Sequence, residues 1–73
     1  MKARARALAA RIVKLGRRGE WSVALGELKA ENAIARREAV RLLYERLSRD
    51  EWETWCRYHP ASRFHELKER GAL

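Results

Sequence analysis

Three side chains that could bind a metal lie close together near the C-terminal end of the sequence, namely Cys56, His59 and His65. Thiolate and imidazole are ligands that zinc prefers, but a structural zinc site needs four of them, and the only nearby fourth ligand is the carboxylate of Glu69. Cys56 also follows Trp55 on the apolar side of a predicted helix, where a free cysteine commonly fills space in a core. We therefore expect no metal here and a structural role for Cys56.

Residues 65–69, His-Glu-Leu-Lys-Glu, come close to the His-Glu-x-x-His motif of zinc proteases. Glu69 stands where the second histidine would have to be, and one histidine cannot hold the catalytic metal. The sequence contains no glycine-rich phosphate loop, nucleophile elbow or pair of catalytic carboxylates. A chain of 73 residues also leaves little room for a pocket of roughly 300 Å³ or more. We predict that the protein is not an enzyme and has no cofactor.

Positive charge is concentrated at the start of the chain. The formal net charge is +7, and no acidic residue precedes Glu20. The basic residues before it are Lys2, Arg4, Arg6, Arg11, Lys14, Arg17 and Arg18. From residue 19 onward the basic and acidic residues balance, so the first segment carries the whole excess. Charge localised in this way indicates an anionic partner.

The predicted binding site lies on this first segment and consists of Arg4, Arg6, Arg11, Lys14, Arg17 and Arg18. At about 100° per residue, four of these cations share one face of a helix. The face could contact RNA or DNA phosphates or an acidic protein, lie on an anionic membrane, or simply be the solvated side of a packed helix. The apolar stripe on the opposite side is needed for the core, which argues against insertion into a membrane. We expect a polyanion or an acidic protein as the partner.

Aromatic residues gather around the single proline, Pro60. Exposed aromatics beside arginine often anchor protein interfaces. The second candidate interface therefore comprises Tyr58, Arg63, Phe64, Lys68 and Arg70. The alternative is that this segment is a frayed terminus.

Apolar residues recur at helical spacing along the whole chain, and no alternating strand pattern is present. The expected buried positions are Ala5, Leu8, Ala9, Ile12 and Leu15; Trp21, Ala24, Leu25 and Leu28; Val40, Leu43, Tyr44 and Leu47; and Trp52, Trp55 and Cys56. The sequence predicts an all-α fold, a small single-domain bundle of four to five short helices spanning residues 1–73. Residues 61–73 form either a last short helix, ending near Gly71, or a loose C-terminal tail.

The helix boundaries have recognisable signals. Gly16 is suited to a C-terminal cap, and Gly19 keeps the following link non-helical. Asn32 can cap the third helix, and residues 48–51 (Ser-Arg-Asp-Glu) form a capping box for the fourth. Within that fourth helix we expect Glu53 to pair with Arg57.

Residues 15–25 resemble the inter-helix turn of tetratricopeptide and pentatricopeptide repeats, in which a glycine and an aromatic residue precede an Ala-Leu pair. Such repeats need about three copies, and the sequence has no second copy, so the resemblance implies a helical hairpin without repeat function. A helix-turn-helix motif is disfavoured. Aligning either Gly16 or Gly26 on its turn would put Ser22 or Asn32 where buried aliphatic residues are required.

The single cysteine excludes an intrachain disulfide and fits a reducing compartment. The sequence shows neither an apolar run of about 20 residues nor a signal peptide. We expect a cytoplasmic monomer that does not associate with a membrane.

In size, composition and charge placement the whole chain resembles the small RNA-polymerase-binding transcription regulators of a Xanthomonas phage. The resemblance implies binding to bacterial RNA polymerase in the host cytoplasm, interference with sigma-dependent initiation, and antitermination together with the elongation factor NusA. It assigns no role to any single residue. The alternative is a small basic nucleic-acid-binding protein without a polymerase partner.

Overall fold

A computed structural model describes residues 2–71. This part of the chain folds into five helices and contains no strand, as the sequence predicts: α1 (Lys2–Arg17), α2 (Trp21–Lys29), α3 (Ala33–Arg46), α4 (Arg49–Tyr58) and α5 (Ser62–Glu69). The Cα radius of gyration of 11.2 Å is the value of about 11 Å expected for a compact chain of this length. None of the five helices is long and apolar enough to cross a membrane.

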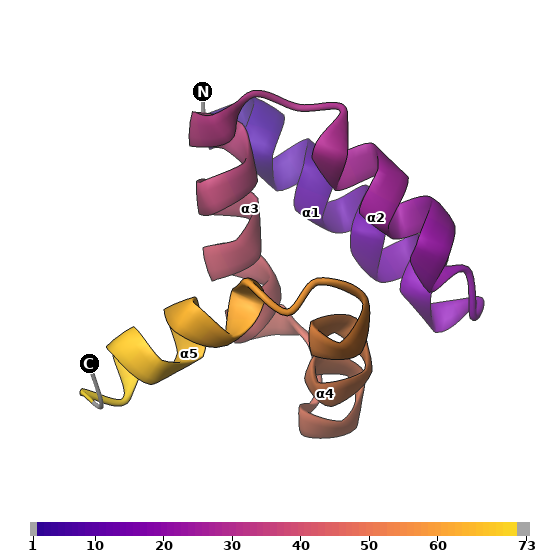
Figure 1. Cartoon of the computed structure of the whole chain (residues 1–73). Coiled ribbons are helices and arrows are strands. Elements are labelled where there is room, and N and C mark those ends of the chain that lie inside the picture. The colour runs from indigo at the N-terminus through magenta and orange to yellow at the C-terminus, as the bar shows by residue number, and fades with distance from the viewer. Residues whose placement is uncertain (1, 72–73) are drawn as a thin grey trace.

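Helices α1 and α2 lie side by side as an antiparallel hairpin (Figure 1), the arrangement expected from residues 15–25. Gly19 makes the turn, with φ +79°, a value that residues with a side chain rarely adopt. The expectation for Gly16 is wrong. Gly16 lies inside α1 and is buried, and a Cβ atom there would overlap the ring of Trp21. Its role is to let Trp21 pack against α1.

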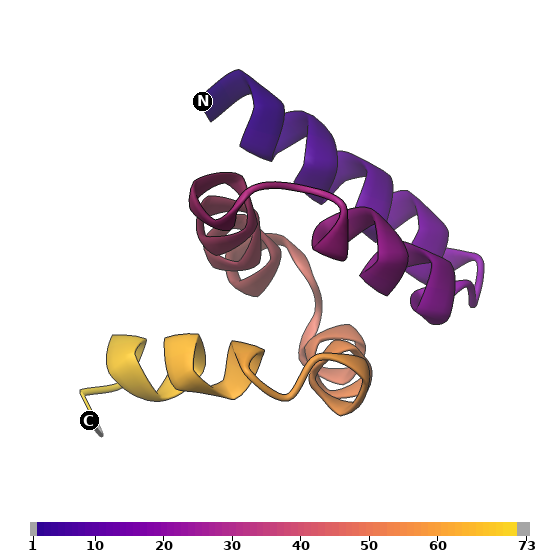
Figure 2. The same cartoon turned by 45° about the horizontal axis from the view of Figure 1, so that its top comes forward.

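Helix α3 is the central element and separates the α1–α2 hairpin from α5 (Figure 2). As predicted, Asn32 caps the start of α3. Its side chain accepts a hydrogen bond from the backbone N–H of Ala35 at 2.9 Å. Ala35 and Ala39 are buried, and such small side chains allow helices to approach closely.

The core contains the apolar positions that the sequence indicates, with three differences. Leu8, Ile12, Leu28, Leu43 and Trp55 are fully buried. Leu15, Leu25 and Tyr44 are only half-buried and pack against the edge of this core. These three residues lie at the margins of their helical stripes, where one side faces solvent.

Helix α4 begins with the predicted capping box, in which Ser48 and Glu51 satisfy each other's backbone N–H groups. It ends at Tyr58, just before Pro60, since the residue that precedes a proline avoids helical geometry. The pair expected within this helix is wrong. Glu53 pairs with Arg63 of α5, and Arg57 donates to Thr54 instead.

Helix α5 occupies most of the segment for which the sequence left open a loose tail. Two buried polar side chains hold it against α4. Glu66 accepts a hydrogen bond from Trp52 Nε1 at 2.7 Å, and Ser62 Oγ accepts one from Trp55 Nε1 at 2.8 Å. Residues 72 and 73 lie outside the described part of the chain.

Candidate functional site

Internal ion pairs account for nearly all of the negative charge. Every glutamate lies within ion-pair distance of an arginine or, for Glu69, of His65. The arginines engaged in this way are Arg4, Arg11, Arg17, Arg18, Arg41, Arg63 and Arg70. Within residues 2–71, the basic side chains without a carboxylate partner are Lys2, Arg6, Lys14, Lys29, Arg36, Arg37, Arg46, Arg49, Arg57 and Lys68. The positive charge left for a partner therefore belongs to this second set.

Three of the predicted binding residues lie along the seam between α1 and α2, seven positions apart. Their pairs are Arg4–Glu31 at 2.9 Å, Arg11–Glu27 at 3.0 Å and Arg18–Glu20 at 3.1 Å. In this series, only Arg11 donates a well-aligned hydrogen bond. The three arginine side chains are about half exposed or more, and such pairs contribute little to stability. The paired glutamates neutralise the three arginines, so the net charge on this side of α1 is lower than the sequence alone indicates.

Arg17 links α1 to α4. Its Nε donates to Glu51 at 3.0 Å, and Glu51 also belongs to the capping box of α4. The hydrogen bond from Arg17 is the main cause that lowers the pKa of Glu51, followed by the backbone N–H of Ser48. Arg17 is thus part of the structure that connects these helices.

The remaining cations of α1 lie toward α3. Lys14 borders a broad hollow of about 690 Å³ between α1 and α3, and we call this the α1–α3 basic hollow. Its lining residues are Ala10, Val13, Lys14, Arg17, Arg18 and Arg46. No acidic side chain lines it. Lys2 and Arg6 border a smaller hollow beside the Glu38–Arg41 pair.

The second candidate interface divides into two groups. Arg63 and Arg70 both donate to the buried carboxylate of Glu66, and Arg63 also pairs with Glu53, so these two arginines hold α5 in place. The hydrogen bond from Trp52, followed by that from Arg63, lowers the pKa of Glu66. Tyr58, Phe64 and Lys68 are exposed, as expected. Tyr58 borders a separate hollow, so only Phe64 and Lys68 share a surface.

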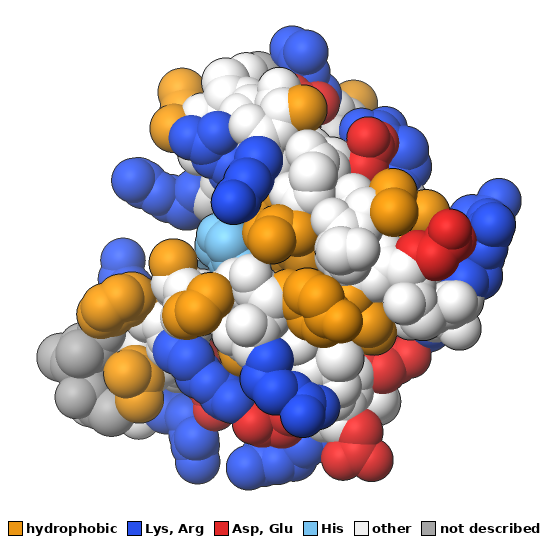
Figure 3. Space-filling view, turned by 45° about the vertical axis from the view of Figure 1, so that its right-hand side comes forward, with side chains coloured by type: hydrophobic (Ala, Val, Ile, Leu, Met, Phe, Trp, Pro, Cys, Tyr) orange, Lys and Arg blue, Asp and Glu red, His pale blue; other side chains and the backbone are white. Residues whose placement is uncertain are grey.

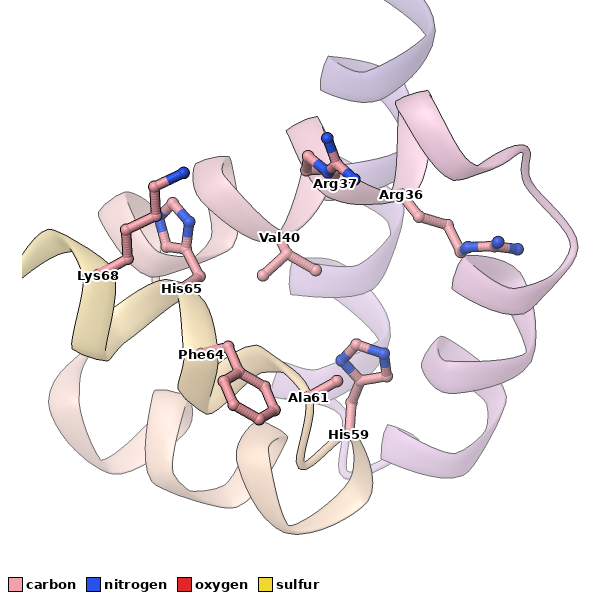
Figure 4. Close-up of a pocket in the computed structure, with 8 residues that line it drawn as sticks. All are labelled: Arg36, Arg37, Val40, His59, Ala61, Phe64, His65 and Lys68. Atoms are coloured by element: carbon pink, nitrogen blue, oxygen red, sulfur yellow. The ribbon is translucent and has the colours of Figure 1, made fainter. Parts of the chain in front are cut away.

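Phe64 and Lys68 border a pocket of about 390 Å³ between α3 and α5, which we call the α3–α5 pocket (Figure 4). Its lining residues are Arg36, Arg37, Val40, His59, Ala61, Phe64, His65 and Lys68. The expectation that so short a chain leaves little room for a pocket of roughly 300 Å³ or more is wrong, since the space between α3 and α5 holds a pocket of about 390 Å³. The binding residues predicted from sequence include neither Arg36 nor Arg37, which the structure places at this pocket.

Two lining residues of the pocket are fixed by hydrogen bonds. Arg36 Nη1 donates to the backbone oxygen of Glu31 at 2.7 Å, next to the end of α2. His59 Nδ1 lies 2.7 Å from Ser62 Oγ, which already accepts from Trp55. Ser62 Oγ has two lone pairs, so either its hydroxyl or the Nδ1–H of a neutral His59 ring can donate in this bond, and the tautomer of the ring decides which. Burial, and to a lesser extent the charges of Lys29 and Arg36, lowers the pKa of His59 and favours this neutral form.

The structure gives other contacts to the three side chains considered above as zinc ligands, Cys56, His59 and His65. Burial raises the pKa of the Cys56 thiol to about 11, so it is protonated at neutral pH. His59 is bonded to Ser62, and His65 packs edge-on against Tyr44 with ring centroids 5.5 Å apart. Among the residues that the structure describes, no three metal-ligating side chains come together.

The surface view shows how the charges are distributed. In Figure 3, acidic side chains lie mostly at the right and lower edges, each near a basic one. At the upper left, basic side chains surround a histidine and no acidic side chain is beside them. Comparisons with known protein families, with curated proteins and with solved structures found no match for this chain.

Proposed function

We propose that this protein is a non-enzymatic transcription regulator that binds bacterial RNA polymerase. It would act by occupying a surface of the enzyme, which blocks sigma-dependent initiation or promotes antitermination together with NusA. The proposal of a polymerase partner rests on the resemblance in size, composition and charge placement described above.

One structural observation supports binding to an anionic partner. Eight of the nine glutamates pair with an arginine, whereas ten basic side chains in the described part of the chain have no carboxylate partner. Lys14 and Arg46 bring this charge together at the α1–α3 basic hollow. Such a surface attracts acidic patches of a protein or phosphates of a nucleic acid and accelerates their encounter.

The second candidate function is direct nucleic-acid binding without a polymerase partner. The α3–α5 pocket favours it, because exposed Phe64 lies there next to basic side chains and no carboxylate lines the pocket. Stacking on aromatic rings combined with cationic contacts to phosphates is the usual mode of binding for single strands.

Affinity purification of the protein from a bacterial lysate, with and without nuclease treatment, distinguishes the two functions. The polymerase proposal predicts that polymerase subunits are retained after nuclease treatment. Loss of all polymerase on nuclease treatment, with nucleic acid recovered otherwise, would support the second function and contradict the first.

A further inference from the structure

We propose that the α3–α5 pocket holds one nucleotide of a single-stranded nucleic acid, with the base stacked on Phe64 and the phosphates bound by Arg37 and Lys68. The pocket is separate from the α1–α3 basic hollow, and no polymerase is needed to fill it. The inference goes beyond the polymerase proposal and rests on the second candidate function, for which it names the kind of nucleic acid and the residues that bind it.

The positive charge of the side chains that line the pocket favours an anionic ligand. The lining includes three basic side chains, Arg36, Arg37 and Lys68, and two histidines, but no acidic side chain. Glu69 lies 3.7 Å from His65 but does not itself line the pocket. With no carboxylate in its lining, the pocket keeps the positive charge of these side chains available for an anionic ligand.

The exposed ring of Phe64 indicates that the ligand contains an aromatic base, which can stack on it. Its side chain is 64% exposed, although it belongs to a helix that Glu66 and Ser62 fix firmly to α4. In Figure 4, the rings of Phe64 and His59 stand on either side of Ala61, and Val40 lies above them on α3. A rigidly held, exposed aromatic ring beside apolar side chains offers a planar base a place to stack.

The three basic side chains that line the pocket differ in the contacts that they already make. One nitrogen of the Arg36 guanidinium is already bonded, because Nη1 donates to the carbonyl oxygen of Glu31. Arg37 and Lys68 are exposed and have no carboxylate partner in the described part of the chain. They are therefore the side chains available to bind phosphate.

The geometry favours a single strand over a duplex. A base in a duplex is stacked and paired, so its face cannot reach Phe64 unless the base is first flipped out. The volume of about 390 Å³ lies within the range of roughly 300–1,000 Å³ that is typical of small-ligand sites, so it suits a single nucleotide.

Fluorescence anisotropy with labelled oligonucleotides of roughly ten nucleotides tests the proposal, since single-strand sites span about 4–16 nucleotides. Mixed-sequence single-stranded DNA and RNA are compared with a duplex of the same sequence, and a 2-aminopurine base reports stacking by loss of its fluorescence. The purified protein is expected to bind single strands more tightly than the duplex and to quench 2-aminopurine.

Phe64→Leu should weaken single-strand binding by about fivefold or more and abolish the quenching, because base–aromatic stacking is lost while an apolar side chain remains. The matched control is Ile34→Ala, which removes an apolar side chain that is 67% exposed on α3 and does not line the pocket. It should bind like the unaltered protein. Arg37→Gln and Lys68→Gln should each reduce the slope of log affinity against log salt concentration by about 0.7, whereas Arg49→Gln should leave the slope unchanged.

Three results would overturn the proposal: no binding to either single strand, equal binding of the Phe64→Leu variant, or a duplex bound as tightly as the single strand. A polyglutamate peptide that displaces the oligonucleotide and is itself weakened by Phe64→Leu would assign the pocket to an acidic protein segment instead. If the pocket variants have no effect while polymerase is still captured, the inference fails and the proposed function stands. Oligonucleotide binding that depends on Phe64, without capture of polymerase, would support the inference and contradict the proposed function.

Discussion

Replacing Glu66 by alanine should destabilise the protein strongly, because this side chain joins α5 to the rest of the fold. Glu66 is only 6% exposed and accepts hydrogen bonds from Trp52, Arg63 and Arg70. Without the carboxylate the buried Trp52 N–H has no partner, which costs about 1–3 kcal/mol. The two arginines are partly exposed and can turn to water, so each adds no more than about 1 kcal/mol.

The expected total is about 2–4 kcal/mol. A domain of this size has roughly 4–11 kcal/mol of stability, so the variant should lose a large share of it. The melting temperature should fall by about 10 °C or more, measured by circular dichroism at neutral pH. Glu66→Gln keeps an acceptor for Trp52 and should cost about 1 kcal/mol.

Acid titration adds a second measurement on the same residue. Hydrogen bonds lower the pKa of Glu66 in the folded protein, so its contribution is present above the ordinary pKa of 4.5 and is lost as the pH falls below that value. The Glu66→Gln variant should therefore lose less stability on acidification than the unaltered protein. Some loss remains, since the pKa values of Glu38, Glu51 and Glu53 are lowered as well.

The matched control is Glu69→Ala, on the same helix. Glu69 is about half exposed and lies 3.7 Å from His65, so its loss should change stability by less than about 0.5 kcal/mol. An unchanged melting temperature for Glu66→Ala, or equal effects of the two variants, would refute the reasoning about α5.

Further predictions concern the core, His59 and Cys56. Leu43 is fully buried, so Leu43→Ala should cost about 2–5 kcal/mol in urea denaturation, and an unchanged midpoint would contradict the core described here. The pKa of His59 is lowered from 6.5, so the unfolded chain binds a proton that the folded protein does not, and stability should fall as the pH drops below about 6.5. His59→Asn should lose this dependence in melts between about pH 7 and pH 5, and the same slope in both proteins would show that another group titrates. Cys56 is buried with a pKa of about 11, so a thiol reagent should react with it only after unfolding, and rapid labelling of the native protein would be inconsistent with its position.

The local features of the fold could be predicted from sequence because their causes are local. The cap at Asn32, the capping box at Ser48 and the end of α4 before Pro60 each depend on residues only a few positions apart. The buried stripes follow from helical spacing in the same way. The role of Gly16 could not be predicted, because it comes from Trp21, which reaches Gly16 only after the hairpin has closed.

The charged surface could be predicted only in part, because ion pairs depend on which helices become neighbours. The α1 cations are conspicuous in sequence, but their pairing with Glu20, Glu27 and Glu31 depends on the register of α1 against α2. The spacing of seven residues between Arg4, Arg11 and Arg18 was the available signal. Glu53 pairs with Arg63 and not with Arg57 for the same reason, since α5 folds back over α4.

No local pattern in the sequence indicates the α3–α5 pocket. Arg37 and Phe64 are far apart along the chain and meet at one site only because of the angle at which α5 leaves α4. That angle is set by the buried hydrogen bonds of Ser62 and Glu66, two polar residues that helical spacing alone does not mark as structural.

The central claim is that unpaired cations at the α1–α3 basic hollow bind an anionic partner, and a charge-reversal experiment on purified bacterial RNA polymerase tests it most directly. The Lys14→Glu/Arg46→Glu variant reverses two cations of the hollow, and the Arg49→Glu/Arg57→Glu variant makes the same change in net charge outside it. Both sites are exposed, so both variants should keep their helical circular-dichroism signal. We expect polymerase affinity to fall at least tenfold for the first variant, to change little for the second, and to weaken with salt for the unaltered protein. Equal affinity of all three proteins, or an equal loss in both variants, would contradict it.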